Sequence, residues 1–363
     1  MKNDYLDNAI KFGAGRYQQG IGLLEKCGAE LKRFGKKVYI VSGVRAFEAV
    51  KERLLPSLER EEINYVVEIF EEACSYKAAA ECAEKCLEAG CDEVVGIGGG
   101  KIMDFSKAVA KSAGVGVVNI PTSISTCAAF TNMSVMYTTD GIYDGSWRYE
   151  YEVDAVIVDL DIIVNCPSRF AAAGILDAMA KKIEIQNGKA VMLPDENTFD
   201  KYTSYRIAEY AYDILEYYGK QAIKDIEKNK ITTAVEYVTF INIAVTGLIA
   251  NITKSFNQAA LAHEMYYGIR TYFTKVAEKV LHGEIVAVGL FVQLYYNRLS
   301  SHKEKLLNYM KEMNMPLTLS ELGIDITDDN LNILETYLLQ SPYVECSKES
   351  QNLIHEAITH IKY

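Results

Sequence analysis

The sequence predicts an α/β N-terminal domain built on a parallel sheet, followed by an all-α C-terminal domain. Strand-like and helix-like segments alternate up to residue 164, whereas from Ser168 onward the patterning is nearly all helical, with few glycines. Alternation of this kind is typical of βαβ units. A chain of 363 residues is also long enough for about two domains. We therefore expect domains at 1–165 and 166–363.

Each element of the first domain has a local signal. Apolar runs bounded by turn residues predict buried strands, and 3.6-residue periodicity predicts helices between them. Gly90 and Gly114 follow helical segments, at the position where glycine commonly ends a helix. The expected order is strand 36–41, a helix ending near 58, strand 63–70, helix 76–90, a strand within 91–98, helix 101–114 and strand 115–123.

The segment after residue 128 is less regular. SVMYTTDGIYDGSWRYE contains Asp-Gly at 140–141 and 144–145, which favours a β-hairpin. AVIVDLDIIV (155–164) is the last expected strand, and the character of the chain changes after Cys166 and Pro167.

Composition excludes several functional classes. The chain is 49% hydrophobic and 24% charged, with a net charge of −11 and no long Lys/Arg run, which argues against nucleic-acid binding. No apolar run approaches the roughly 20 residues of a membrane helix, and the amino-terminal stretch lacks the apolar region of a secretion signal. The eight cysteines are scattered and form no CxxC pair, which favours free cysteines in a reducing compartment. We expect a cytoplasmic protein that binds neither membrane nor nucleic acid.

A glycine-rich turn is the candidate phosphate site. GIGGGKIMD (96–104) lies between an expected strand and an expected helix, where glycines let a phosphate approach the backbone and the free N–H groups of the helix start. It is neither the GxGxxG fingerprint nor a P-loop. A tight turn without a ligand is the alternative interpretation.

The end of the first strand bears on cofactor choice. A carboxylate there would bind a ribose 2′-hydroxyl and repel a 2′-phosphate. Here Gly43 takes that place, Arg45 follows, and the first carboxylate is Glu48. If a dinucleotide binds, this favours NADP over NAD, unless Arg45 is simply a solvated side chain.

Two of the five histidines, His263 and His282, lie nineteen residues apart. HEMYY at 263–267 begins like the HExxH motif of zinc proteases but lacks its second histidine. Asp177 is the one carboxylate in the apolar segment AAAGILDAMA, where an unpartnered charge would be costly. Two imidazoles and a carboxylate suit a divalent metal. Structural histidines and a capping aspartate remain the alternative.

GRYQQG, GGGKIMD, IPTSIST, AGILDAMAK, AHEMYYG and LHGEIVAVG occur in the order found in the iron-containing, or group III, alcohol dehydrogenases. The chain resembles this family from about residue 10 to about 300, and the glycerol dehydrogenase branch most of all. The resemblance implies a dinucleotide-binding α/β domain, a helical metal-binding domain and an active site between them, as in the dehydroquinate synthase-like fold. It also implies a homo-oligomer that acts on a small-molecule substrate.

The resemblance assigns roles by position. Asp177, His263 and His282 would bind one divalent metal, zinc ahead of iron, which polarises the substrate oxygen while hydride passes between substrate and NAD or NADP. The remaining positions would bind the cofactor, at the pyrophosphate, along the cleft and at the nicotinamide: Gly99, Gly100, Lys101 and Asp104, then Thr122 and Ser125, then Thr131, Met133 and Tyr137.

Three positions depart from patterns found among members of the family. Cys127 stands where an aspartate holds a substrate hydroxyl, which favours a hydroxycarboxylate dehydrogenase-like branch that reduces 2-oxo acids with NADPH. Lys181 replaces a histidine found in iron-type members, and we expect it to point away, because a second cation would weaken metal binding. Tyr267 replaces another histidine, and either relays a proton or only packs.

The function predicted is therefore metal-dependent NAD(P) oxidoreduction of the CH–OH group of a small polar alcohol or 2-hydroxy acid. A glycerol-1-phosphate dehydrogenase or a dehydroquinate synthase-like cyclase on the same fold is an alternative, although the Lys- and Asn-rich cyclase segment is missing. A non-catalytic nucleotide-binding homologue is the alternative from another class.

Overall fold

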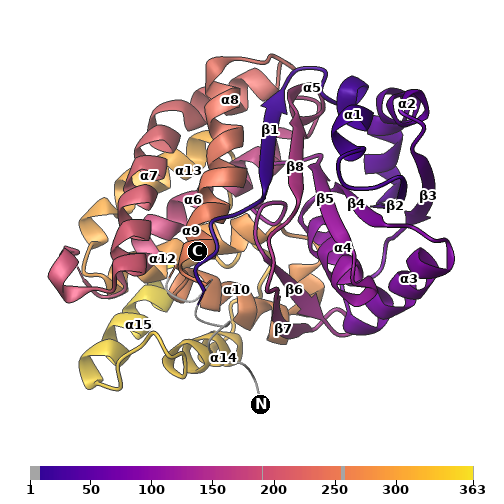
Figure 1. Cartoon of the computed structure of the whole chain (residues 1–363). Helices are drawn as coiled ribbons and strands as arrows, with labels where there is room; N and C mark the ends of the chain where they lie inside the picture. Colours follow the sequence, from indigo (N-terminus) through magenta and orange to yellow (C-terminus); the bar gives the residue numbers. More distant parts are fainter. Residues whose placement is uncertain (1–8, 190, 255–257, 363) are drawn as a thin grey trace.

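The computed structural model describes residues 9–189, 191–254 and 258–362. Residues 1–8, part of the amino-terminal stretch considered above for a secretion signal, lie outside the described residues. Figure 1 shows a strand-rich half, coloured indigo to magenta, beside a helical half that runs from magenta to yellow. The predicted fold class is confirmed.

A parallel six-stranded sheet forms the first half, in the order β1-β8-β5-β4-β2-β3. The turn at 140–141 joins an antiparallel pair, β6 and β7, which confirms the predicted hairpin. The strands are β1 Arg16–Gly20, β2 Lys37–Ser42, β3 Asn64–Ile69, β4 Glu93–Gly98, β5 Gly116–Pro121, β6 Met133–Tyr137, β7 Tyr143–Arg148 and β8 Ala155–Asp159.

Helices cover both faces of the sheet and make up most of the second half. Those of the first half are α1 Cys27–Leu31, α2 Val44–Arg60, α3 Tyr76–Glu88, α4 Gly100–Ala113 and α5 Leu160–Ile163. Those of the second half are α6 Ser168–Gln186, α7 Phe199–Ile226, α8 Thr233–Phe240, α9 Thr246–Ile252, α10 Leu261–Tyr272, α11 Thr274–Ala277, α12 His282–Tyr296, α13 Lys303–Glu312, α14 Asp328–Leu339 and α15 Lys348–His360.

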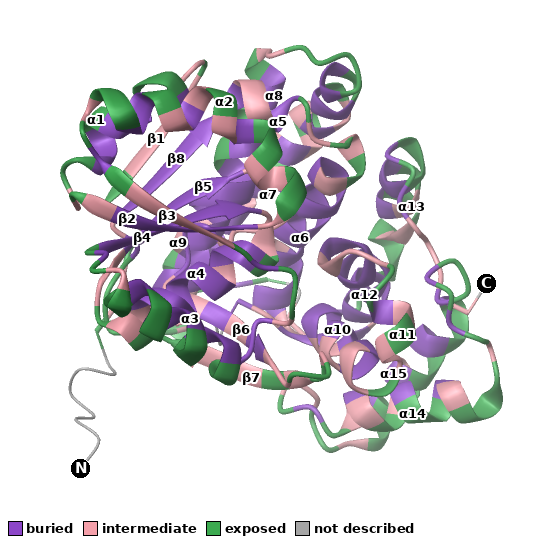
Figure 2. Cartoon of the chain, turned by 90° about the vertical axis from the view of Figure 1, so that its right-hand side faces the viewer, coloured by how far each residue is buried: buried purple, intermediate pink, exposed green. Residues whose placement is uncertain are grey.

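Side chains along each strand point alternately to the two faces of the sheet, so the core of the first half is divided into two clusters. Val38 and Ile40 of β2 pack in a cluster with α2, whereas Tyr39 and Val41 face the larger cluster that contains α3 and α4. Because both faces are covered, the central strands are buried almost throughout (Figure 2). The carboxyl ends of the strands therefore stay at one edge of a rigid sheet, where the loops that follow them can build a site.

One expected strand ends earlier than predicted. The run 155–164 is extended only to Asp159 and then turns into the short helix α5. Asp159 ends the strand because its carboxylate accepts the N–H of Asp161, at 3.0 Å, and the N–H of Leu24, at 2.9 Å. An aspartate that caps a helix start outweighs the apolar character of the next residues.

The expectation that no apolar run approaches the length of a membrane helix is wrong for Thr233–Ile252, which is long and apolar enough to cross a membrane, judged by length and composition. It comprises α8, a π-helical turn at Ile241–Val245 and α9. Of its most apolar window, 72% is buried inside the protein, which is also the behaviour of an ordinary core helix.

Candidate active site

Three helices bring Asp177, His263 and His282 together. Asp177 lies in the middle of α6, His263 in the first turn of α10, and His282 is the first residue of α12. Asp177 Oδ1 lies 3.2 Å from His263 Nε2 and 3.4 Å from His282 Nε2. The three ligand atoms all lie within 4.8 Å of one another, and no other such group of three His, Cys, Asp or Glu exists among the described residues. This donor set fits a divalent metal.

Glycines allow the helices to approach this closely. A Cβ on Gly283, next to His282, would lie 2.0 Å from the carbonyl oxygen of Ala173 on α6. A Cβ on Gly174 would lie 1.9 Å from the carbonyl oxygen of Ile124, in the loop after β5. Helix α6 therefore packs backbone against backbone on both sides, which sets Asp177 between α12 and the carboxyl edge of the sheet.

A buried carboxylate, which the sequence analysis missed, holds His263. Glu184 Oε2 accepts a 2.6 Å hydrogen bond from His263 Nδ1, and its Oε1 accepts the N–H groups of Ala260 and His263. Glu184 follows Asp177 by seven residues, two helical turns, so both project from the same face of α6. A carboxylate behind a histidine commonly orients it for a metal.

A second carboxylate fixes the start of α12. Glu284 makes a two-pronged ion pair with Arg169, with contacts of 2.5 and 2.7 Å, and accepts the N–H of Leu281 at 2.8 Å. Arg169 lies near the start of α6. The pair therefore joins the two helix starts beside His282.

The electrostatics of the group favour a charged Asp177. Burial by itself would raise the pKa of Asp177, but the ammonium of Lys181 and the two adjoining histidines hold that pKa well below its usual range. Burial lowers the pKa of His282. Burial alone would lower the pKa of His263, but the carboxylate of Glu184 outweighs burial and raises the pKa of His263. An anionic oxygen thus lies between two imidazoles, as a cation site requires.

Lys181 does not point away from this group, so that expectation is wrong. Its side chain is 3% exposed, and Nζ lies 2.9 Å from His263 Nε2 and 3.4 Å from Asp177 Oδ1. Lys181 follows Asp177 by one helical turn and shares its face of α6. A carboxylate buried on that face attracts the cation more strongly than the distant solvent does.

A cavity of about 570 Å³ joins these groups to the sheet edge. Arg148, Tyr266 and Arg270 also line it, and the sequence analysis missed them. The expected residues that line this cavity are Gly100, Lys101, Asp104, Cys127, Thr131, Met133, Tyr137, Asp177, His263, Tyr267 and His282. Elements from both halves of the chain therefore share one hollow.

Four expected residues do not line the cavity: Gly43, Gly99, Thr122 and Ser125. They lie at or just after the carboxyl ends of the neighbouring strands β2, β4 and β5. Gly43 and Gly99 are the N-caps of α2 and α4, and neither helix start has a side-chain cap. The N–H groups there can bind an anion that spans this edge.

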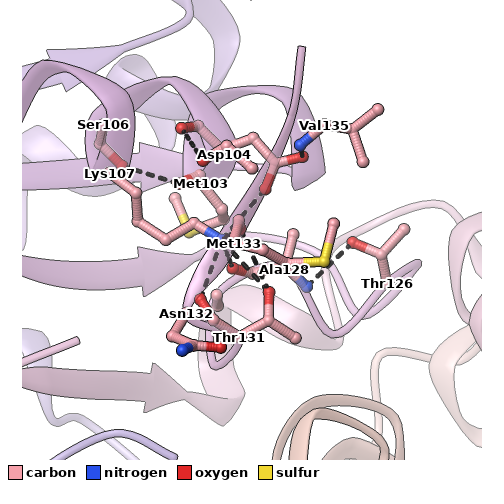
Figure 3. A network of polar contacts seen from close by, with 12 residues as sticks. Met103, Asp104, Ser106, Lys107, Thr126, Ala128, Thr131, Asn132, Met133 and Val135 are labelled. Carbon is pink, nitrogen blue, oxygen red and sulfur yellow. Dashed lines mark hydrogen bonds and ion pairs between the residues drawn. The ribbon is translucent and has the colours of Figure 1, made fainter. Parts of the chain in front are cut away.

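Lys107, which the sequence analysis also missed, ties the loop after β5 to α4 (Figure 3). Its buried Nζ lies 3.1 Å from Asp104 Oδ1 and donates to the carbonyl oxygens of Ala128, Thr131 and Met133. Asp104 in turn accepts the N–H of Val135. One buried ammonium thus holds the cavity wall that contains Cys127, Thr131 and Met133.

Tyrosines form another part of the cavity wall. The hydroxyls of Tyr137 and Tyr266 lie 2.8 Å apart, and the Tyr266 ring meets the His282 ring edge-on, with centroids 4.2 Å apart. Tyr267 stacks on Tyr143 of the hairpin, with centroids 4.5 Å apart. Tyr266 follows His263 by three residues, a helical spacing that could have drawn attention to it.

Comparison with known proteins agrees with this arrangement. The profile described as "Iron-containing alcohol dehydrogenase" matches residues 14–160. A glycerol dehydrogenase of Thermotoga maritima is 32% identical over 323 residues, covering 87% of this chain and 86% of the relative. Hydroxycarboxylate dehydrogenase A of Escherichia coli is 30% identical over 295 residues, covering 79% and 78%.

Among solved structures, a probable glycerol dehydrogenase from Sinorhizobium meliloti superposes with a TM-score of 0.83 at 25% identity. The match covers 97% of this chain and 98% of that one. The likeness therefore extends through the helical half, beyond the residues that the profile matches. The chain belongs to the iron-containing alcohol dehydrogenase family and is a metal-dependent NAD(P) oxidoreductase of CH–OH groups.

Proposed function

We propose that Asp177, His263 and His282 bind the catalytic metal and that this cavity is where a small 2-hydroxy acid or polyol exchanges hydride with the cofactor. The observation that carries the proposal is the shared cavity: the metal-binding group opens into the same hollow as Gly100 and Lys101. We assign residues 1–165 to dinucleotide binding and 166–363 to metal binding. Glycerol-phosphate oxidation, cyclisation and a non-catalytic role are not favoured, because the relatives are named as dehydrogenases of uncharged or carboxylate substrates.

When bound, the metal polarises the carbon–oxygen bond of the substrate and the nicotinamide exchanges hydride with that carbon. The chain supplies the positions. Glu184 turns His263 Nε2 toward the site, and the start of α4 at Gly99 and Gly100 binds the pyrophosphate. Lys107 holds the wall that would meet the nicotinamide, where Thr131, Met133 and Tyr137 lie. Zinc is proposed ahead of iron, because Lys181 stands where iron-type members have a histidine.

NADP is proposed ahead of NAD. The ribose 2′ position of a dinucleotide bound at this edge falls near the end of β2. Gly43 lies there without a carboxylate, and the free N–H groups at the start of α2 can bind a 2′-phosphate. Gly43 has φ −80° and open space around it, so its backbone does not require glycine. The glycine is therefore better explained by the ligand than by the fold.

A 2-hydroxy or 2-oxo acid is proposed ahead of glycerol as substrate. Cys127 lines the cavity, and burial raises the pKa of its thiol to about 12, so the group carries no charge there. Lys101, Lys181, Arg148 and Arg270 line the same cavity. Asp104, Asp177 and Glu264 line it too, but a neutral thiol at position 127 adds no further carboxylate, so the cavity suits an anionic substrate better than an aspartate there would.

A substrate screen tests the choice. Zinc-loaded protein would be mixed with NADPH or NADH and with pyruvate, 2-oxobutanoate or dihydroxyacetone, and loss of nicotinamide absorbance followed. We expect the highest kcat/KM with a 2-oxo acid and NADPH. A preference for dihydroxyacetone with NADH would mean that Cys127 and Gly43 are tolerated in a polyol dehydrogenase.

The metal assignment has its own test. The His282→Ala variant should lose metal and activity together, whereas His302→Ala, at an exposed histidine outside the cavity, should keep both. Full activity and full metal content in His282→Ala would end the assignment. A small-molecule substrate, a homo-oligomeric state and a cytoplasmic location complete the proposal.

A further inference from the structure

Lys181 occupies the space in which a metal ion would meet its ligands. Its Nζ lies 2.9 Å from His263 Nε2 and 3.4 Å from Asp177 Oδ1, and the side chain is 3% exposed. These are two of the three atoms that would coordinate the metal. The ammonium thus supplies, inside the protein, the positive charge that a metal would otherwise supply to Asp177.

With Lys181 as an ammonium, the contact assigns the hydrogen-bonding roles of His263. An ammonium only donates, so His263 Nε2 is the acceptor in its contact with Lys181. His263 Nδ1 then carries the proton and donates to Glu184. This is the tautomer in which a histidine binds a metal through Nε2.

A metal and Lys181 cannot hold His263 at the same time. A ring nitrogen of neutral imidazole has a single lone pair, and here that lone pair accepts the proton of Lys181. A bound metal requires the same lone pair, and its charge repels an ammonium at such short range. Lys181 must therefore leave the ligand atoms when a metal enters, and the adjoining cavity, which Lys181 lines, is the space open to it.

We propose that Lys181 is an internal competitor of the metal: it keeps the ligands arranged in the metal-free chain and must be displaced for the metal to bind. This inference rests on the proposed metal site. Without Lys181 a bare carboxylate would be buried beside two imidazoles, which is costly. The lysine therefore stabilises the metal-free protein and weakens metal affinity, so the metal exchanges more readily than the three ligands alone would allow.

Zinc affinity measures the competition directly. Metal-free wild type, Lys181→Met and Lys181→Gln would be titrated with Zn²⁺ against a chromophoric chelator. Lys182→Met is the matched control, because Lys182 lies on the same helix but its ammonium lies over the ring of Tyr212, 4.4 Å from the centroid. We expect both Lys181 variants to bind Zn²⁺ at least tenfold more tightly than wild type and the control. Ordinary structural damage would weaken binding, so a gain in affinity is diagnostic.

Thermal stability gives a second readout, in which the metal-free Lys181 variants should lose stability although they gain zinc affinity. The metal-free Lys181 variants should melt below metal-free wild type, and Zn²⁺ should raise their Tm by more than it raises that of wild type. Where a variant does not stay folded without metal, chelator-driven zinc release from the loaded protein gives the same affinity comparison. Zinc affinities within twofold of wild type, or weaker, would overturn the competition.

The outcomes separate this inference from the metal site on which it depends. If wild type and His282→Ala bind Zn²⁺ equally, the proposed ligand set is wrong. If wild type binds one equivalent, His282→Ala binds none and the Lys181 variants match wild type, the ligand set stands and the competition alone is wrong.

Discussion

Glu184 and His263 form a short contact beside the proposed metal-binding group: Glu184 Oε2 accepts a 2.6 Å hydrogen bond from His263 Nδ1. The other carboxylate oxygen accepts the backbone N–H of the same histidine, at 2.9 Å. A single buried carboxylate thus fixes both the ring and the backbone of His263. The first turn of α10 is therefore ordered by a residue of α6, on which Asp177 also lies.

Replacing Glu184 should weaken metal binding without removing a ligand. In Glu184→Gln the amide lacks the charge that favours the His263 tautomer with Nε2 free, so metal affinity should fall by about 10- to 100-fold. Zinc titration against a chelator measures this. Glu264→Gln is the control, because Glu264 neighbours His263 in sequence but its carboxylate is hydrogen-bonded to Tyr337. An unchanged affinity in Glu184→Gln would show that the ring is oriented by packing alone.

The close contact of α12 with α6 makes Gly283 a sensitive position of the site. In Gly283→Ala the new methyl group would lie 2.0 Å from the Ala173 carbonyl, so the helices must separate and carry His282 away from Asp177. We expect a loss of about 1–3 kcal/mol in the free energy of unfolding, as for other overpacked cores, together with loss of metal.

Gly20→Ala is the matched control, since its new methyl group meets nothing closer than Leu23, at 3.7 Å. Denaturant unfolding and metal analysis of the two variants separate the effects. Normal metal content in a stable Gly283→Ala protein would mean that α12 can shift without moving His282.

Much of the fold could be predicted from local patterns. Gly90 and Gly114 have φ of +64° and +70°, so the two helix ends inferred from glycine are correct for the physical reason given. The strand at 155–164 was predicted too long because the capping carboxylate of Asp159 has partners far away in sequence, such as Leu24. Periodicity reports which residues are apolar, but not which distant backbone groups need an acceptor.

Residues of the site could be predicted where a sequence motif marks them, but not where only the fold brings them together. Asp177, His263 and His282 were named from residue type and resemblance, and the structure brings them together. Glu184 and Lys107 lie in helical segments without any local sign of their partners, which come from α10 and from the loop after β5. The direction of Lys181 was predicted wrongly because repulsion by a metal was considered without the attraction of the Asp177 carboxylate.

Stability should depend on pH through a carboxyl far from the active site. Glu93 begins β4, at the opposite end from the cavity, and burial and then the nearby Asp154 raise its pKa from 4.5 to about 9. A raised folded-state pKa contributes stability that is fully present below the unfolded pKa, near 4.5, and is lost as pH rises toward 9. Glu93→Gln removes this loss, so it should stabilise the protein, by about 1–3 kcal/mol near pH 8.

Thermal melts of both proteins between pH 5 and pH 9 test this, with a Tm difference that widens as pH rises. Glu88→Gln, at an exposed position near the end of α3, serves as the control. A Tm difference that is constant with pH would show that the Glu93 carboxyl does not gain a proton on folding.

The proposed preference for NADP predicts how Gly43→Asp behaves. A Cβ at position 43 meets no atom within 4 Å, and φ is −80°, so aspartate fits without strain and can cap the start of α2. Its carboxylate would repel a 2′-phosphate and accept a hydrogen bond from a 2′-hydroxyl. We expect kcat/KM for NADPH to fall at least tenfold while that for NADH is kept or rises. Gly43→Asn has nearly the same shape without the charge, so it should change the ratio of kcat/KM for NADPH to that for NADH far less. Equal losses of kcat/KM with both cofactors in Gly43→Asp would mean that the ribose binds elsewhere.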